Sequence, residues 1–274
     1  MAIEFTKMHG LGNDFIVIDS RGIALPDLPG LSKKLCNRRF GVGADQLLVL
    51  LESDSADFRM RIFNQDGGEV EMCGNGIRCL AKYIWDRGLS GRETLDIETL
   101  AGIIKPEKSG ELIRVDMGAP ALEAKDIPVN LKGRVTDYPL EVDGRVFDIT
   151  CVSMGNPHAV IFVDNVSEFP VSYYGPLIES HPLFPKRTNV EFIEVLNPDE
   201  IRMRVWERGA GMTMACGTGA SASAVASNLK GLTREKVKVL LEAGELFIEW
   251  PAGGHVYMTG PAEEVFEGRI EIEN

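Results

Sequence analysis

The sequence has no long hydrophobic run, and its longest wholly apolar stretches, residues 47–51 among them, are five residues long. A helix that crosses a bilayer needs about 20 such residues. The opening residues MAIEF also lack the basic and apolar parts of a secretory signal. We therefore expect a cytoplasmic protein with no membrane partner.

Cysteine and histidine are scarce, and neither occurs in a metal-binding spacing. There are four histidines, no C-x-x-C pair and an odd number of cysteines, at Cys36, Cys73, Cys79, Cys151 and Cys216. A disulfide framework needs paired cysteines, and a structural zinc site needs clustered ligands. We expect reduced thiols and no metal.

Basic residues are also in deficit. Lys and Arg number 29 against 41 Asp and Glu, so the formal net charge is −12. This balance argues against nucleic acid or an anionic membrane as a partner. The balance does not exclude a small anionic or zwitterionic ligand that binds at a locally positive site. With 44% hydrophobic and 26% charged residues over 274 positions, the chain is long enough for one large globular domain or two ordinary ones.

What the sequence does contain is an internal repeat. Cys73-Gly74-Asn75-Gly76 returns as Cys216-Gly217-Thr218-Gly219, and RMRIF at 59–63 returns as RMRVW at 202–206. The separation is 143 residues in both cases. The same separation relates Asn13 to Asn156, Gln46 to Asn189, and Asn64 to Glu207. We interpret the chain as two copies of one domain.

The pattern of each copy predicts more strands than helices. Helices are expected over 31–39, with Ser32 as N-cap, and over 75–87 and 218–230. Most other connections look too short for β-α-β crossovers, so we expect an α/β (α+β) fold in which a mainly antiparallel or mixed sheet wraps round one long helix per domain. The expected domains are 1–118 and 119–262, and the last strand, within 263–274, returns to the first.

Cysteine is usually a small buried hydrophobe, and we interpret Cys36, Cys79 and Cys151 in this way. Cys73 and Cys216 differ, because each precedes Gly-x-Gly at the expected start of a helix. Free N–H groups and the helix dipole at such a position lower a thiol pKa and bind anions. We predict two functional thiols at two anion-binding helix ends.

Two thiols on opposite faces of one bound amino acid suggest inversion of its α-carbon. One thiolate would remove the α-proton and the opposing thiol would deliver another, which is general acid–base catalysis. The helix ends would stabilise charge on the carboxylate, so neither a metal nor an organic cofactor is needed. A dinucleotide fingerprint at 217–222 is a weaker interpretation, because the first copy breaks the pattern at Cys79.

The motifs resemble those of the diaminopimelate epimerase family. The stretches MHGLGNDF, GVGADQLL, RIFNQDGGEVEMCGNGIRC, SMGNPH, RTNVEF, RVWERGAGMTMACGTGA and YMTGPA occur in the family's order and span nearly the whole chain. The CGxG element alone is shared with proline-racemase-like proteins. The family fold that this resemblance implies is two pseudo-symmetric domains, each a barrel-like sheet round a central helix.

The resemblance also implies roles for individual residues. Cys73 and Cys216 match the acid and base, and His158 and Glu207 match residues that tune the thiols. The positions that match substrate contacts are Asn13, Gln46, Asn64, Gly74, Asn75, Asn156, Asn189, Glu207, Arg208, Gly217 and Thr218. One departure is Met212, where family members often carry Glu.

The expected activity is therefore cofactor-independent epimerisation of LL- to meso-2,6-diaminoheptanedioate, in lysine and peptidoglycan precursor synthesis. The expected partner is a small amino-acid substrate, and a homodimer is left open. Two alternatives stay open: a proline or hydroxyproline racemase, which would not need Arg208, and a thiol redox or ligand-binding protein, whose cysteines would cycle through a disulfide.

Overall fold

A computed structural model describes residues 2–25, 27–251 and 253–271. The chain divides into two compact units, 1–116 with 259–274 and 117–258. Within the described ranges, no helix has the length and apolar character required to cross a membrane.

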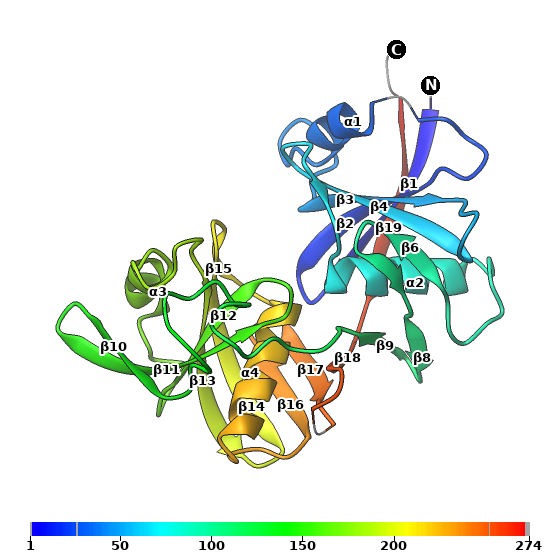
Figure 1. The fold of residues 1–274 in the computed structure, drawn as a ribbon. Coiled ribbons are helices and arrows are strands. Elements are labelled where there is room, and N and C mark those ends of the chain that lie inside the picture. The colour runs from blue at the N-terminus through cyan, green and yellow to red at the C-terminus, as the bar shows by residue number, and fades with distance from the viewer. Residues whose placement is uncertain (1, 26, 252, 272–274) are drawn as a thin grey trace. The chain divides into compact units, whose positions relative to one another are not determined.

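The first unit is built on a mixed eight-stranded sheet (Figure 1). Its strand order is β19-β1-β2-β3-β4-β6-β7, and β5 pairs with β4. The strands are β1 (Ala2–Gly10), β2 (Asn13–Asp19), β3 (Gln46–Leu51), β4 (Phe58–Asn64), β5 (Glu69–Val70), β6 (Ile97–Thr99), β7 (Gly102–Ile104) and β19 (Glu263–Glu271). A hairpin of β8 (Glu107–Ser109) and β9 (Leu112–Asp116) also belongs to this unit.

Two helices pack on this sheet, α1 (Leu28–Leu35) and α2 (Gly74–Asp86). Helix α2 is central, since it contacts β1, β2, β3, β4, β9 and β19. Its apolar stripe Ile77, Leu80, Ala81 and Ile84 is completely buried, as the 3.6-residue spacing predicts. Successive residues of β3 alternate between the two helices: Leu47 and Val49 belong to the core that includes α1, whereas Leu48 lies against Gly76 of α2.

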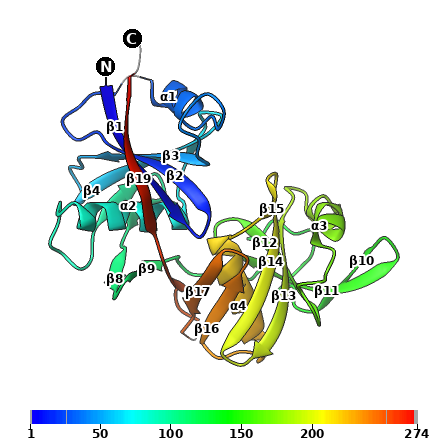
Figure 2. The same ribbon diagram turned by 180° about the vertical axis from the view of Figure 1, so that it is seen from behind.

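The second unit repeats this plan (Figure 2). Its strand order is β10-β11-β12-β13-β14-β16-β17-β18, and β15 pairs with β14. The strands are β10 (Tyr138–Val142), β11 (Arg145–Ser153), β12 (Pro157–Phe162), β13 (Asn189–Asn197), β14 (Glu200–Glu207), β15 (Gly211–Thr213), β16 (Lys236–Leu241), β17 (Gly244–Glu249) and β18 (Tyr257–Gly260), whose last two residues belong to the first unit. The helices are α3 (Val171–Glu179) and α4 (Gly217–Leu229). Helix α4, which contacts six strands of this unit, is lined by buried Ala and Ser.

The repeat separation of 143 residues holds element by element. It relates β1 to β11, α1 to α3, and α2 to α4. Strands β1, β2 and β3 pair in the same way as β11, β12 and β13, antiparallel and then parallel. Strand β19 flanks β1 as β10 flanks β11. The predicted fold class is therefore confirmed: each unit is a mixed sheet around one long helix.

Most strand pairs are antiparallel, as expected, and each of the four helices in the described residues connects two parallel neighbouring strands. One local expectation was wrong. Helix α1 begins at Leu28 and ends at Leu35, with Asp27 rather than Ser32 as N-cap. Asp27 Oδ1 accepts from Gly30 N at 3.1 Å. Ser32 is buried instead and donates to Asn64 O at 2.8 Å, which anchors the helix to β4.

Candidate functional site

Both repeat-related cysteines are helix N-caps. Cys73 precedes α2 and Cys216 precedes α4, each in an extended conformation. Gly76 N donates to Cys73 Sγ at 3.4 Å, and Gly219 N donates to Cys216 Sγ at 3.4 Å. A backbone N–H directed at sulfur stabilises the thiolate more than the thiol. The fold therefore gives each unit one thiol at a helix N-terminus, as the sequence predicts.

In the first unit, the amide side chain of Asn13 lies beside Cys73. Cys73 Sγ donates to Asn13 Oδ1 at 3.8 Å, and Asn75 Nδ2 donates to the same oxygen at 3.2 Å. Gln46 and Asn64 lie directly opposite each other on β3 and β4, and Gln46 Nε2 donates to Asn64 Oδ1 at 2.8 Å. The predicted residues of this unit thus form two short amide clusters at the ends of strands.

A charged network holds the loop behind Asn13. Asp14 accepts from Lys7 Nζ at 2.6 Å and from Arg38 at 2.7 and 3.0 Å. Arg38 also donates to Asp45, whose other oxygen accepts from Asn13 Nδ2 at 2.8 Å. Burial by itself would raise the pKa of Asp14, but hydrogen bonds from Arg38 and Lys7 outweigh it and lower that pKa to about 2. The network fixes the orientation of the Asn13 amide.

In the second unit, Cys216 is only 5% exposed. Its Sγ lies 3.5 Å from Thr218 Oγ1, which accepts from Asn156 Nδ2 at 3.3 Å. Asn156 Oδ1 is 2.9 Å from His158 Nε2. The structure thus brings four sequence-predicted residues into one hydrogen-bonded series that ends at the thiol.

A second group in this unit lies where β13 and β14 meet. Asn189 Oδ1 accepts from Arg208 N at 2.9 Å, while Asn189 Nδ2 donates to Pro157 O at 2.9 Å. Glu207 Oε1 accepts from Thr213 Oγ1 at 2.5 Å. The Arg208 guanidinium donates through Nη1 to Lys186 O at 3.2 Å.

The helix end does not lower the pKa of Cys216 overall. Burial, and then the carboxylates of Glu207 and Glu191, hold the pKa of this thiol well above its usual value, although Thr218 and Gly219 N–H oppose them. For Cys216 the expectation of a lowered pKa was therefore wrong, because the cap also buries the sulfur. Burial likewise raises the pKa of Cys36, and that of Cys151 to about 12.

Two buried charged residues beside these sites were missed in the sequence. Arg78 lies under the first turn of α2, where it donates to Gly74 O at 3.2 Å and Asn75 Oδ1 at 2.9 Å. Glu191 lies on β13, 2.7 Å from His158 Nδ1. A usable signal existed for Glu191: it is a charged residue inside an apolar strand, and the repeat aligns it with Leu48.

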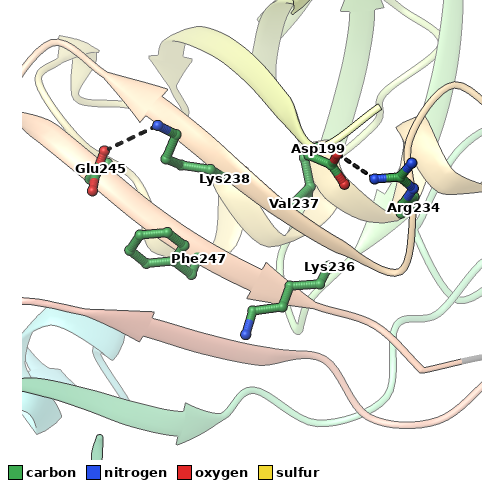
Figure 3. Close-up of a pocket in the computed structure, with 7 residues that line it drawn as sticks. All are labelled: Asp199, Arg234, Lys236, Val237, Lys238, Glu245 and Phe247. Atoms are coloured by element: carbon green, nitrogen blue, oxygen red, sulfur yellow. Dashed lines mark hydrogen bonds and ion pairs between the residues drawn. The ribbon is translucent and has the colours of Figure 1, made fainter. Parts of the chain in front are cut away.

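Met212, the departure from the family pattern, lies on β15 and is 47% exposed, with its sulfur 3.3 Å from Arg204 Nη2. A separate surface pocket of the second unit contains none of the predicted site residues (Figure 3). Four of its charges pair, Arg234 with Asp199 and Lys238 with Glu245, and Lys236 also lines it. In the described part of the chain, no group of His, Cys, Asp and Glu is arranged to hold a metal.

Comparison with solved structures shows the fold. A phenazine biosynthesis protein of the PhzF family from Bacillus anthracis matches with a TM-score of 0.74 at 19% identity, over 99% of this chain and 100% of that one. A hydroxyproline epimerase from Agrobacterium vitis, with bound trans-4-hydroxy-L-proline, matches with a TM-score of 0.71 at 14% identity, over 98% and 92%. At these identities the likeness concerns architecture alone.

Comparison of sequences is more specific. The family model described as diaminopimelate epimerase matches residues 5–123 and 150–265. A diaminopimelate epimerase of Pelotomaculum thermopropionicum is 59% identical over 97% of this chain and 98% of its own length. One from Moorella thermoacetica is 58% identical over 99% and 100%. The chain therefore belongs to the diaminopimelate epimerase family.

Proposed function

We propose that this protein converts LL-2,6-diaminoheptanedioate into its meso isomer, a step in lysine and peptidoglycan precursor synthesis. The observation that carries the proposal is the matched pair of thiols, each an N-cap that accepts a backbone N–H. Identity of 59% to a named diaminopimelate epimerase supports the choice of substrate.

In this mechanism the two cysteines exchange roles during each turnover. One thiolate takes the α-proton and becomes a thiol, which leaves a carbanion stabilised by its carboxylate. The other thiol gives its proton to the opposite face and becomes a thiolate. The atoms balance without oxidant or reductant, and the stereocentre inverts. Helix N–H groups stabilise the charge that develops on the carboxylate.

The remaining site residues would bind the substrate. We assign Asn13, Gln46, Asn64, Gly74, Asn75, Asn156, Asn189, Glu207, Arg208, Gly217 and Thr218 to this task, and His158 and Glu207 to the tuning of the thiols. Arg208 would bind the distal carboxylate, because a guanidinium offers a planar pair of donors. Arg208→Lys should lower kcat/KM by more than about tenfold, since Lys lacks that geometry.

The direct test is α-hydrogen exchange in D₂O, followed by NMR, with LL and meso substrate and no added cofactor. Cys73→Ser and Cys216→Ser should each lower epimerisation by about 10²–10⁴-fold. Each variant should still exchange slowly with the isomer that its remaining cysteine serves. Cys36→Ala, at a buried cysteine on the opposite side of the first sheet, is the matched control and should keep full activity. Near-normal inversion by either Ser variant would refute the acid–base pair.

Two other functions make different predictions. A proline or hydroxyproline racemase, suggested by the fold of the Agrobacterium vitis enzyme, would act on proline and tolerate Arg208→Lys. A thiol redox protein would show no α-hydrogen exchange with any amino acid.

We also propose a cytoplasmic homodimer. Strand β19 is at an edge of its sheet, and Val265 and Phe266 on it are exposed. An exposed apolar edge strand favours pairing with another chain. Sedimentation equilibrium of the wild type and Phe266→Glu tests this proposal: a monomeric wild type would refute it.

A further inference from the structure

A hydrogen-bonded series leads from a completely buried carboxyl group to the Cys216 thiol. Glu191 Oε1 is 2.7 Å from His158 Nδ1, and His158 Nε2 is 2.9 Å from Asn156 Oδ1. Asn156 Nδ2 donates to Thr218 Oγ1 at 3.3 Å, and this oxygen is 3.5 Å from Cys216 Sγ. All five groups belong to the second unit.

Burial determines how many protons the first pair holds. The side chains of Glu191 and His158 are both 0% exposed. In the described part of the chain, Glu191 Oε2 has no hydrogen-bond partner. A pair with net negative charge would be costly here, so the uncharged combination is favoured. One proton then lies between Oε1 and Nδ1, on either atom, and a second proton remains on Nε2.

That second proton sets the direction of the whole series. A protonated Nε2 must donate to Asn156 Oδ1, which turns the amide so that Nδ2 faces Thr218. Since Thr218 Oγ1 accepts this bond, its own hydrogen remains available for Cys216 Sγ. A hydroxyl that donates to sulfur stabilises the thiolate.

The first unit lacks this arrangement, although its backbone is equivalent. Phe15 occupies the position of His158, and Leu48 that of Glu191. A Cβ added at Gly76 would lie 3.2 Å from Leu48 and 3.4 Å from Phe15, and one added at Gly219 would lie 2.8 Å from Glu191 Oε1. The space beneath the helix N-terminus is thus filled by apolar side chains under Cys73 and by ionisable side chains under Cys216.

We propose that Glu191 is a positioning residue that acts through His158 and directs the Thr218 hydroxyl hydrogen at Cys216 Sγ; the proposal rests on the reactive role given above to Cys216. The ionisable groups that face Glu191 and the thiol are His158 on β12, Glu207 on β14 and Cys151 on β11. Burial and the Glu207 carboxylate oppose the Cys216 thiolate, so the directed hydroxyl is the device that lets this thiol give up its proton.

The first test reads the proton on His158 in the unaltered protein. ¹⁵N NMR of histidine-labelled protein distinguishes a protonated ring nitrogen from a bare one, and His158→Phe identifies the signal among the four histidines. We expect Nε2 to carry hydrogen at neutral pH. A bare Nε2 would reverse the series and overturn the proposal.

The second test measures the pH dependence of Cys216 alkylation by iodoacetamide, resolved by peptide mass spectrometry, with Cys73 of the same molecules as internal control. Glu191→Leu installs the residue of the first unit and removes the partner of Nδ1. Its Cys216 midpoint should rise by roughly 0.5–1 pH unit, the scale of one hydrogen bond to a charged acceptor. Glu191→Gln keeps a group that can bond Nδ1 without charge, and its midpoint should stay near wild type.

The two variants separate positioning from simple charge. If Glu191 acted only through its charge, both variants would lower the Cys216 midpoint, and the proposal would fail. An unchanged midpoint in Glu191→Leu would overturn it as well. If this variant does not fold, Thr218→Val, which removes the last donor, must give the same rise. Alkylation needs no substrate, so failure of the proposed epimerase activity would appear separately, as absent α-hydrogen exchange.

Discussion

Arg78 Nη2 donates a hydrogen bond to Asn75 Oδ1 at 2.9 Å, inside the first turns of α2. The same guanidinium donates to Pro261 O at 3.0 Å, just before β19. Arg78 is completely buried, and carbonyl and amide oxygens accept its hydrogen bonds. One side chain joins the helix that carries Cys73 to the strand that closes the first sheet.

Replacing this arginine should be costly. Arg78→Met leaves buried acceptors without donors, and we expect a loss of about 3 kcal/mol or more in the free energy of unfolding. Urea unfolding measures the loss. Arg92→Met is the control, because its side chain is 55% exposed and a surface ion pair contributes at most about 1 kcal/mol. Equal effects of the two substitutions would contradict this account.

The hydrogen bonds and ion pairs of Asp14 should make the free energy of unfolding fall at low pH. The pKa of Asp14 is lowered from 3.8 to about 2 in the folded protein, so its contribution is complete above the unfolded value and is lost as the pH falls through the folded one. At neutral pH, Asp14→Asn should cost roughly 2 kcal/mol.

The measurement is the difference in unfolding free energy between wild type and Asp14→Asn as the pH is lowered. The difference should shrink between about pH 4 and about pH 2. Asp199→Asn, in a surface pair whose carboxylate is 57% exposed, should show a difference of only a few tenths of a kcal/mol. A constant difference for Asp14→Asn down to the lowest pH would argue against the network.

The two glycines beneath the thiols should respond differently to alanine. At Gly76 the added Cβ meets the end of the Leu48 side chain at 3.2 Å, which can give way. At Gly219 it would lie 2.8 Å from Glu191 Oε1 and must displace a buried carboxylate. We expect Gly219→Ala to lose about 1–3 kcal/mol and Gly76→Ala clearly less. Thermal unfolding of both variants measures the two losses. A larger loss for Gly76→Ala than for Gly219→Ala would show that the Glu191 carboxyl is not packed under α4.

Glu207 should oppose ionisation of Cys216. Its carboxylate is, after burial, the largest cause that raises the pKa of this thiol. Glu207→Gln should therefore lower that pKa and speed alkylation of Cys216 at mildly alkaline pH. Cys73 provides the comparison within each molecule. A slower reaction of Cys216 in the variant would mean that Glu207 acts mainly through its bond to Thr213.

Much of the architecture followed from the repeat in the sequence. The helices expected over 75–87 and 218–230 are found at Gly74–Asp86 and Gly217–Leu229, because glycine-led N-termini and apolar spacing are local properties. The last strand was expected to return to the first domain, and β19 pairs along β1. Helix α1 was misplaced because its cap, Asp27, lies before a proline in the first turn, and Ser32 offered an equally good local cap.

The surroundings of the two cysteines were harder to predict from the sequence than the fold. Hydrogen-bond partners far apart in the chain, such as His158 and Glu191, depend on which strands become neighbours. The raised pKa of Cys216 depends on burial, which the motif does not encode. The family resemblance supplied residues that line the thiols and omitted those behind them, Glu191 and Arg78.

The pairing of β19 with β1 has a consequence for the order of events during synthesis. Strand β10 precedes β11 in the chain, so the second sheet receives all of its strands in one continuous stretch of translation. Strand β1 emerges from the ribosome early, yet its outer partner follows the whole of the second unit. The half of the protein that is made first is thus the half that is completed last, and the nascent chain must keep the outer edge of β1 from pairing elsewhere until β19 arrives.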